Sequence, residues 1–561
     1  MGGQSDETQN GELNRYFVYT VVGIAVLAGL YVRLAGRGDV HLFGDEFHSV
    51  WNLNKPYGQL FRLYDTFGSG TALPVMQRAS IDLFGAGLWA YRFAATIGAV
   101  GALLLMYPVA RRLVGQTAAI IATLALSASS IHIFYSQFGR CHALVVFLSL
   151  LLVYALCRII NGDRPALFWH ALLALSAGLL PWVHLTTAVF VAGLAVAGAI
   201  MIIVRKQSPR DLYRLFTDFA IGSGISIGLY LPAWGALKQF VGMLAGRCTF
   251  ANFGVLDVVN LLAGNRPAGL IMLAGVPAAA IWMLIRYRST AFLLVAATFA
   301  PVVGLAAVRP AGETYAYARW LLAGLPFMLM LLAWLLVQLV RRMNLPKRLT
   351  GYAEVVAGAI LVGAAFLTGP MGLNHTQDGP FANTYLTMMP LPAFDVPWDR
   401  TPAFYKTLAS SSKPVEIIEA PELVGNSVLL YRNYYLQHRK KVLIGLVRGF
   451  TATDVHLPAG PYVPLSDTNW DKNCSADYLI LHLNALDEAS RYWSFVYNQV
   501  WPTMADRAVR SLMIKQAALV TPTSLPADVA ERLRAKLGRP VYEDSQIVVW
   551  NLKSPRDGYT R

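Results

Sequence analysis

Residues 141–157 read CHALVVFLSLLLVYALC and carry no charged side chain. An uncharged apolar run of about this length can cross the hydrocarbon core of a bilayer when it is helical. Arg140 precedes the run and Arg158 follows it, so charges stand at both of its boundaries. The stretch therefore predicts a membrane-spanning helix, and the rest of the chain can be divided by the same criterion.

Apolar runs bounded by charge recur along the chain as far as residue 372. Only 14% of the 561 residues are charged and 55% are hydrophobic, whereas about 25% of a soluble protein is charged. A single soluble globule is therefore excluded. The runs predict an α-helical polytopic membrane domain with about eleven spans, at residues 16–34, 91–110, 116–134, 141–157, 167–181, 184–204, 214–232, 268–285, 290–308, 320–340 and 352–372.

Basic residues lie in alternate connections between these spans, and the positive-inside rule assigns such connections to the cytoplasm. They are Arg111, Arg112, Arg158, Arg164, Arg205, Lys206, Arg210, Arg214, Arg286, Arg288, Arg341, Arg342, Lys347 and Arg348. These residues account for nearly all of the net charge of +15, so the charge does not imply a nucleic-acid partner. With a cytoplasmic N-terminus, eleven crossings leave the C-terminus outside. We therefore predict a multi-pass protein of the bacterial inner (plasma) membrane.

The composition changes beyond residue 373. Short segments there alternate with turn residues, predicting helices at 404–408 and 428–437 and strands at 415–418, 441–444, 478–482 and 546–550. We predict a transmembrane domain at 1–373 and a periplasmic α/β domain at 374–561. In the first outer loop, Leu60, Phe61, Leu63 and Phe67 favour a helix in the membrane interface.

Two adjacent carboxylates, Asp45 and Glu46, follow the first predicted span. A carboxylate near a low-dielectric boundary can act as a general base or bind a metal ion. The alternative interpretation is an acidic turn in contact with water. The pair is nevertheless a candidate catalytic group, because it lies beside the membrane on the predicted outer face.

Further polar residues gather at the same predicted face. They are Gln137, Arg140 and His142 between the third and fourth spans, His184 at the tip of a hairpin, and Tyr317 and Arg319 before the tenth span. Arginine can instead extend to lipid headgroups, and tyrosine or histidine can be an interfacial anchor. Because the outer face is not where the charge rule favours arginine, these residues are candidates for binding a ligand.

A carboxylate pair, fixed cations and hydrogen-bonding aromatic residues beside a lipid phase suit the transfer of a sugar from a lipid-linked phosphate. The polyprenyl phosphate leaves as a stable anion, so no general acid is required, unlike in a glycosidase. One base must take the proton of the attacking hydroxyl, and arginines can hold the phosphate with two hydrogen bonds each.

These motifs resemble the GT-C glycosyltransferases, in particular the branch of bacterial protein O-mannosyltransferases and lipid A aminoarabinose transferases. The similarity rests on Gly44-Asp45-Glu46, Tyr135-Ser136-Gln137 with Arg140, His184, and Arg319-Trp320 with Pro326, in the same order. The resemblance implies a polyprenyl-phosphate sugar donor and an inverting single displacement. It also implies that Asp45 is the base, that Glu46 helps place a substrate, and that the phosphate and sugar contact Arg140, Arg319, His184, Gln137, Tyr317 and His142.

Two departures from the family pattern stand out. Many relatives read Ser-Gln-Glu-Ala-Arg-x-Tyr where this chain has Phe138, Gly139 and His142, so an acid and a tyrosine are missing here. The C-terminal domain also matches no acceptor-specific domain. The acceptor therefore stays open among lipid A or its core, another envelope polysaccharide and a protein hydroxyl, and the identity of the sugar stays open as well.

A transporter and a binding protein are the alternatives to an enzyme. A transporter or lipid flippase with an accessory periplasmic domain would be expected to have broken helices and polar residues near the membrane midplane. A binding protein would not need eleven spans as an anchor. Magnesium or manganese could bridge Asp45 and the phosphate, whereas the spacing of the four cysteines indicates no zinc site. Cys248 and Cys474, both expected outside, could form a disulfide.

Overall fold

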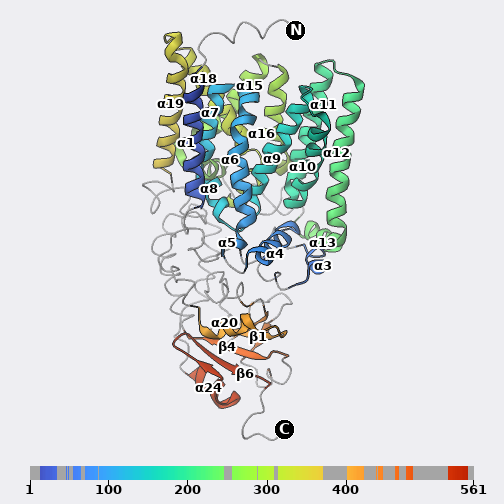
Figure 1. Ribbon diagram of the computed structural model, residues 1–561, viewed down its shortest axis with the longest axis vertical. Helices are drawn as coiled ribbons and strands as arrows, with labels where there is room; N and C mark the ends of the chain where they lie inside the picture. Colours follow the sequence, from blue (N-terminus) through green and yellow to red (C-terminus); the bar gives the residue numbers. More distant parts are fainter. Residues whose placement is uncertain are drawn as a thin grey trace. The chain divides into compact units, whose positions relative to one another are not determined.

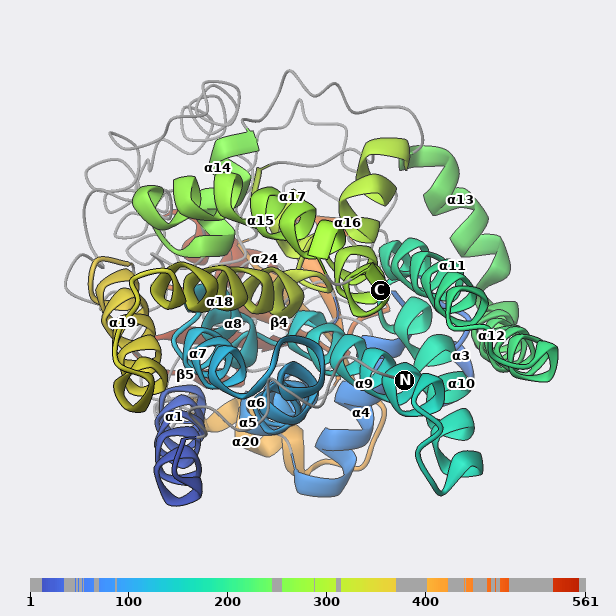
Figure 2. The ribbon, with the colours of Figure 1, turned by 90° about the horizontal axis from the view of Figure 1, so that it is seen from above.

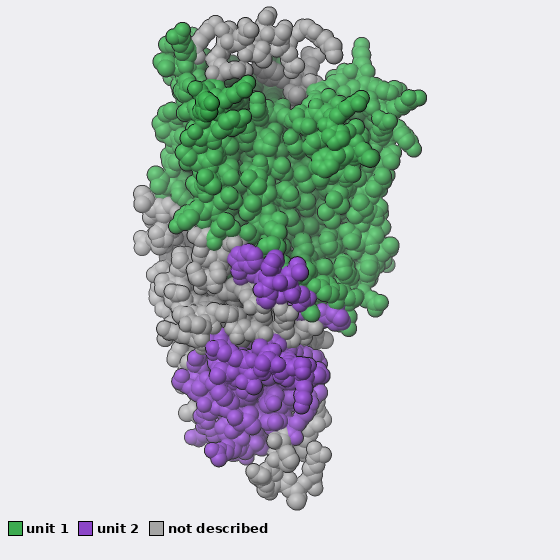
Figure 3. All heavy atoms as spheres, in the orientation of Figure 1, with its two compact units in different colours: residues 1–37, 57–80, 91–387 green, residues 38–56, 81–90, 388–561 purple. Residues whose placement is uncertain are grey.

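The computed structural model describes residues 13–34, 46, 49, 53, 55–64, 70–85, 88–244, 255–286, 288–308, 314–369, 401–421, 438, 440–446, 462–465, 470, 475–483 and 528–553. The chain divides into two compact units, coloured separately in Figure 3. Unit 1 comprises residues 1–37, 57–80 and 91–387, and unit 2 comprises residues 38–56, 81–90 and 388–561.

Unit 1 is a bundle of long helices that run side by side (Figure 1). They are α1 (Arg15–Leu34), α6 (Phe93–Val114), α7 (Gln116–Ser127), α8 (Ser130–Gln137), α9 (His142–Ile160), α10 (Ala166–Val183), α11 (Ala188–Val204), α12 (Pro209–Tyr230), α15 (Arg266–Arg286), α16 (Arg288–Val308), α18 (Leu325–Arg341) and α19 (Lys347–Leu367). A helix suits these apolar sequences because it satisfies its own backbone hydrogen bonds, which lipid cannot do.

Each of the eleven predicted spans overlaps a helix, and the last three residues of the span at 352–372 lie outside the described residues. Eight helices in the described part of the chain are long and apolar enough to cross a membrane, and α7 with α8, bent by 52° at their junction, would be a ninth. The apolar parts of α16 and α18, Ala291–Ala307 and Leu325–Arg341, are shorter. The protein is thus a multi-pass membrane protein, while the exact number of spans stays a prediction. The predicted hairpin within residues 167–204 is confirmed as α10, a 3₁₀ turn (Leu185–Thr187) and α11.

The centre of the bundle is formed by α6, α7 and α9, and α1, α12 and α19 lie at its edge (Figure 2). Burial within the protein follows this arrangement, from 67% of the apolar window of α9 to 22% of those of α1 and α19. Small residues allow the closest approaches between helices. A Cβ atom at Gly98 of α6 would lie 2.4 Å from the Leu144 backbone of α9. The start of α9 is therefore held tightly against α6.

Shorter helices of unit 1 lie at one end of the bundle. They are α3 (Tyr57–Leu60), the first part of α4 (Ala72–Phe84), α13 (Trp234–Leu244), α14 (Val255–Ala263) and α17 (Thr314–Trp320). The end of α4 and most of α5 (Leu88–Tyr91) belong to unit 2. The interfacial helix predicted from Leu60 onward is wrong, because α3 ends at Leu60 and the longer helix of this loop is α4. Leu60 and Tyr64 are buried, and Tyr64 packs with Tyr230 and Phe240 in an aromatic cluster, so neither faces lipid.

Unit 2 contains a six-stranded sheet with the order β3-β2-β1-β4-β6-β5. The strands are β1 (Glu416–Ala420), β2 (Lys441–Leu446), β3 (Tyr462–Pro464), β4 (Tyr478–His482), β5 (Tyr542–Glu543) and β6 (Ile547–Asn551). Strands β1 to β4 are parallel, and β6 and β5 are antiparallel to their neighbours. The helices α20 (Ala403–Ser410) and α24 (Asp528–Leu537) flank the sheet (Figure 1).

The small α/β region agrees with the predicted fold class, and each of the four predicted strands overlaps an observed one. The helix predicted at 428–437 lies outside the described residues. The short strands β3 and β5 and the polar helix α24 were missed, since each is too short or too polar to give a distinct hydrophobic period.

A polar network lies inside unit 2 at the sheet. The hydroxyl of Tyr405 donates to Glu419 Oε1 at 2.9 Å and lies 3.0 Å from His482 Nε2. Because the hydroxyl gives its proton to Glu419, it must accept from His482 Nε2–H. Burial lowers the pKa of His482 to about 3 and that of the nearby His438 to about 3, so both rings are neutral near pH 7.

Candidate active site

The turn between α8 and α9 carries Arg140, and two further predicted site residues, Gln137 and His142, flank it. Residues 138–141 separate the two helices, and the Arg140 backbone N–H donates to Phe138 O at 2.6 Å. Side chains from two other elements hold this turn: Gln77 of α4 donates to Gly139 O at 3.0 Å, and Gln137 donates to Val32 O of α1 at 2.6 Å. The position of Arg140 is therefore set by α1 and α4 together.

The start of this turn depends on the break between α7 and α8. Arg33 of α1 donates to the carbonyl oxygens of Leu126 at 2.8 Å and Ser127 at 2.9 Å, which are the last acceptors of α7. Leu126 O also accepts from the Ser129 backbone N–H at 3.2 Å, so Arg33 matters most for the Ser127 carbonyl, which lies at the end of the helix. Arg33 thus stabilises an interrupted helix whose second part, α8, leads directly to the site.

Arg140, His142 and His184 belong to one group of side chains, in which Arg140 and His142 are buried and His184 is partly buried. Arg140 is 1% exposed and His142 is 2% exposed. The rings of His142 and His184 lie 5.2 Å apart, and Tyr135 meets His142 edge-on at 4.5 Å. Thr186 Oγ1 lies 2.7 Å from His184 Nδ1. The tip of the hairpin, at His184, is therefore packed against His142 at the start of α9.

Two guanidinium groups act on His184, which lies between α10 and the 3₁₀ turn. Burial lowers the pKa of His184 to about 3, and the positive charges of Arg319 and Arg140 act in the same direction. His142 is within reach of the same two charges. Arg140 and Arg319 come from segments far apart in the chain, so the fold brings them to one place. Two fixed cations beside neutral imidazoles are suited to an anion that also carries hydroxyl groups.

Cys141 follows Arg140 in the chain and is within reach of the same two charges. Burial raises the pKa of its thiol, and the opposing influences include the charges of Arg140 and Arg319. Cys141 and Cys157 are both buried and free. A thiol with a raised pKa is a poor nucleophile, so the cysteine marks the site without being a candidate for its chemistry.

Tyr317 borders an apolar cavity next to this site. It lies on α17 two residues before Arg319, is buried, and meets the ring of Trp320 at 5.1 Å. The cavity has a volume of about 240 Å³ and is lined by Val255, Val258, Val259, Leu262, Met272, Leu273, Val276, Pro277, Phe299, Val302, Leu305, Ala306, Tyr317, Leu321 and Met328. One short helix therefore connects a basic site with a hydrophobic one.

The sequence did not identify several residues that surround the site. Trp182 stacks with Phe61 at 6.5 Å, and its buried Nε1 has no hydrogen-bond partner among the described residues. Tyr230 donates to Pro181 O at 2.6 Å. Arg33 could have been noticed, because it is a cation at the predicted outer end of a span, where the charge rule does not favour one. Trp182 and Tyr230 gave no such signal, since aromatic residues are common at interfaces.

Of the two adjacent carboxylates, the structure describes only Glu46. Asp45 lies outside the described residues, as do Cys248 and Cys474, so their predicted roles stay predictions. Glu46 is described and its side chain is 0% exposed, which excludes a water-exposed turn as the explanation for this carboxylate. It belongs to unit 2, where Ser49 Oγ donates to its backbone oxygen at 3.3 Å.

The other predicted site residues separate into two kinds. Arg140, His142, His184 and Arg319 lie together, whereas Gln137 donates to the α1 backbone and Tyr317 lines the apolar cavity. Among the described residues there is no group of three His, Cys, Asp or Glu side chains suited to a metal ion.

Comparison with known proteins adds two findings. Residues 71–212 match the family described as dolichyl-phosphate-mannose-protein mannosyltransferase. The crystal structure of ArnT from Cupriavidus metallidurans in the apo state has a TM-score of 0.56 and 12% identity, covering 96% of this chain and 98% of that one. The same protein bound to undecaprenyl phosphate gives 0.56 and 11% identity, covering 98% and 100%. No curated protein sequence matches the chain.

A polytopic helical domain followed by a small α/β domain is thus the fold this chain shares with ArnT. Together with the matched family, it indicates a GT-C glycosyltransferase related to the branch that contains the protein O-mannosyltransferases and ArnT. The family resemblance inferred from the motifs is confirmed.

Proposed function

We propose that the protein transfers a sugar from a polyprenyl-phosphate donor to an acceptor hydroxyl at the periplasmic face of the bacterial inner membrane. The observation that carries the proposal is the convergence of Arg140 and Arg319 on the neutral His184. Two guanidinium groups can bind a phosphate through paired, charge-assisted hydrogen bonds. ArnT, which shares the fold, has been crystallised with undecaprenyl phosphate.

The reaction would be a single displacement with inversion. The acceptor oxygen forms a bond to the anomeric carbon while the bond from that carbon to the phosphate oxygen breaks. Asp45 takes the acceptor proton, and the electron pair of the broken bond leaves on the phosphate. The negative charge that develops there is stabilised by Arg140, which is buried, and by Arg319, which is partly buried.

The remaining predicted residues are assigned to the sugar and the lipid tail. His142 and His184 can exchange hydrogen bonds with sugar hydroxyls, and Nε2 of His142 has no partner among the described residues. Glu46 would help to place acceptor or donor. The apolar cavity beside Tyr317 is suited to isoprenoid units, because hydrocarbon gains free energy by leaving water.

The acceptor is proposed to be lipid A or its core, another envelope polysaccharide, or a protein hydroxyl, with the domain at 374–561 in the periplasm. The transferred sugar would be a hexose or a pentose. A magnesium or manganese ion between Asp45 and the phosphate would add a further positive charge. Assays with EDTA and with each added cation test that part of the proposal.

The decisive experiment uses the purified full chain and a polyprenyl-phosphate sugar labelled in the sugar. We expect transfer to an envelope acceptor fraction, or slow hydrolysis when no acceptor is present, with release of polyprenyl phosphate. In sealed liposomes, movement of intact donor across the membrane without bond cleavage would instead indicate a flippase. Binding of the donor with neither outcome would refute the enzymatic proposal.

A further inference from the structure

Three arginines lie at the end of the bundle opposite to the candidate active site. Arg112 is in the last turn of α6, Arg158 is in the last turn of α9, and Arg205 follows α11 as its C-cap. Helix α9 has 19 residues and begins at His142, and a helix rises about 1.5 Å per residue. Arg158 is therefore about one bilayer core away from Arg140. We call the three residues the distal arginine cluster.

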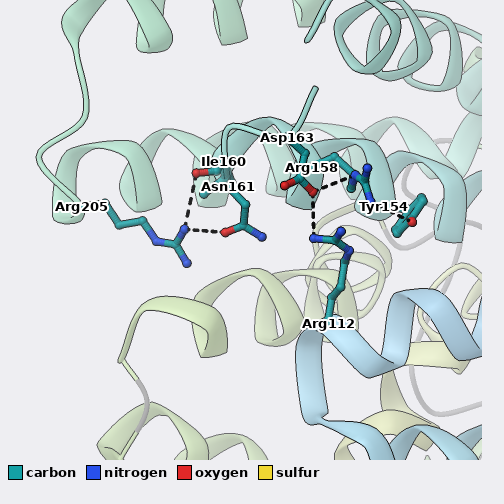
Figure 4. Close-up of polar contacts among 7 residues, drawn as sticks. All are labelled: Arg112, Tyr154, Arg158, Ile160, Asn161, Asp163 and Arg205. Atoms are coloured by element: carbon teal, nitrogen blue, oxygen red, sulfur yellow. Dashed lines mark hydrogen bonds and ion pairs between the residues drawn. The ribbon is translucent and has the colours of Figure 1, made fainter. Parts of the chain in front are cut away.

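The carboxylate of Asp163 forms ion pairs with two arginines of this cluster (Figure 4). Asp163 Oδ2 lies 2.9 Å from Arg112 Nη1 and 2.8 Å from Arg158 Nε. Arg205 Nη1 donates to neutral groups, Asn161 Oδ1 at 2.9 Å and Ile160 O at 3.5 Å. Three positive charges thus face a single negative one, and the cluster with Asp163 has a net charge of +2.

Aromatic rings hold the arginines of this cluster in place. The guanidinium carbon of Arg158 lies 4.5 Å from the centre of the Trp169 ring and 5.7 Å from that of Tyr154. Arg112 lies 5.8 Å from the Tyr154 ring. Stacking of this kind fixes the plane of a guanidinium group and so reduces the entropy that it would lose on binding a ligand.

Part of the hydrogen-bonding capacity of the cluster is unused within the described part of the chain. Neither Nη2 of Arg112 nor Nη2 of Arg158 donates to a described residue, and the two side chains are 31% and 21% exposed. Placement of basic residues at helix C-termini and on one membrane face accounts for positive charge at this end. This general preference for basic residues does not explain why Arg112 and Arg158 share one oxygen of the Asp163 carboxylate.

The adjoining surface is apolar. Leu167 is 81% exposed and Phe168 is 53% exposed, and both lie on α10 next to Trp169. In a multi-pass protein, large exposed apolar side chains on a spanning helix face lipid chains. A molecule held by the cluster could therefore place a charged group on the arginines and hydrocarbon against α10.

We propose that the distal arginine cluster binds the phosphate of an anionic phospholipid in the leaflet opposite to the active site. Arginine suits this ligand because its planar fork donates two hydrogen bonds to one phosphate. The ends of the spans lie at headgroup depth, where basic pockets between helices recognise anionic lipids. The proposal is independent of the proposed glycosyl transfer, because Arg140 and His142 lie at the other end of α9.

The test compares lipid binding by the full chain and its variants in detergent micelles. Retention of phosphatidylglycerol and of phosphatidylcholine is measured by native mass spectrometry, and lipid-induced stabilisation by thermal unfolding. We expect the chain to prefer phosphatidylglycerol and the variant Arg112→Gln/Arg158→Gln to lose about tenfold in affinity for it. The matched control Arg210→Gln/Arg214→Gln removes the same charge from exposed positions at the same end and should change affinity less than about twofold.

A further variant separates lipid binding from a merely structural ion pair. Asp163→Asn frees both arginines and should increase the affinity for phosphatidylglycerol, the opposite of the arginine substitutions. If the cluster only holds the loop, Asp163→Asn and Arg112→Gln will both lower the unfolding temperature and neither will change lipid affinity. Equal losses in the control, or equal protection by inorganic phosphate alone, would also overturn the proposal. Arg112→Lys/Arg158→Lys keeps the charge without the fork and should lie between wild type and the glutamine variant.

Discussion

Arg33 Nη2 lies 2.9 Å from His132 Nδ1, and this contact joins the end of α1 to the helix that leads to the candidate active site. Arg33 Nε donates to the same nitrogen at 3.2 Å. The nitrogen must therefore be an acceptor, with the imidazole proton on Nε2. Nη1 donates to Gly29 O and Ser127 O, both at 2.9 Å, and Nη2 also donates to Leu126 O. All five N–H groups of a buried cation are thus used.

Replacing Arg33 should destabilise the protein and weaken donor binding. In Arg33→Met the Ser127 carbonyl loses the Arg33 donor in a buried place, which costs about 1–3 kcal/mol, whereas Leu126 O keeps the Ser129 N–H. Thermal unfolding and donor titration measure the two effects. Arg15→Met, at the exposed start of the same helix, is the control and should change neither. An Arg33→Met protein with wild-type stability would contradict the proposed role.

The base is tested by Asp45→Asn. The amide has nearly the same size but cannot accept the proton of the acceptor hydroxyl, so transfer should fall by at least about 100-fold. Donor binding and unfolding temperature should be unchanged. Asp211→Asn, which removes an acid from the start of α12, is the matched control. Retention of most activity in Asp45→Asn would refute the assignment of Asp45.

The phosphate contacts are tested by Arg140→Ala and Arg319→Ala. Each removes charge-assisted hydrogen bonds, which contribute about 1.5–3 kcal/mol each, so donor affinity should fall roughly 10- to 100-fold. Arg266→Ala alters an exposed arginine at the start of α15 and serves as the control. Donor titration curves that coincide with wild type for either variant would show that its arginine does not contact the donor.

The apolar cavity makes a prediction about the length of the donor tail. Val276→Phe adds volume inside a cavity of about 240 Å³ and should raise KM for a long-chain polyprenyl donor. The KM for a donor with only two isoprene units should change little, because it does not need the full cavity. Ile271→Phe, on the exposed side of the same helix, is the control. An equal rise in KM for both donors would argue against a tail site here.

The polar network of unit 2 predicts a loss of stability in acid. The pKa values of His438 and His482 are lowered to about 3 in the folded protein, against about 6.5 when unfolded. Between these values the unfolded chain binds more protons, so stability falls as the pH falls from 6.5 towards 3. The slope is up to about 1.4 kcal/mol per pH unit for each histidine.

This dependence can be measured by limited proteolysis of the full chain in urea, following cleavage within residues 401–553 at pH 7.5 and pH 5.0. His482→Gln removes one titrating group and should reduce the slope by about half. His184→Gln, in unit 1, should leave the slope unchanged. A pH-independent unfolding midpoint in the wild-type domain would contradict the prediction.

Much of the fold followed from local sequence patterns. A helix in lipid needs only an uninterrupted apolar run, so each of the predicted spans overlaps a helix within the described residues. The strands around Ile417, Leu479 and Val549 were predicted for a similar reason, because a buried strand is a short apolar run between turns. Arginines on the unfavoured face, Arg140 and Arg319, indicated a site, since a charge in that position needs a compensating role.

By itself, therefore, the sequence determined the class of fold, the helical segments and the family of motifs, all of which depend on neighbouring residues in the chain. Only the tertiary structure decided which side chains meet: Arg33 with His132, His142 with His184, and Arg112 with Arg158 on Asp163. It also decided the order of strands in the sheet. These contacts join residues distant in sequence, and they arise from the packing of whole helices and strands, which no local pattern encodes.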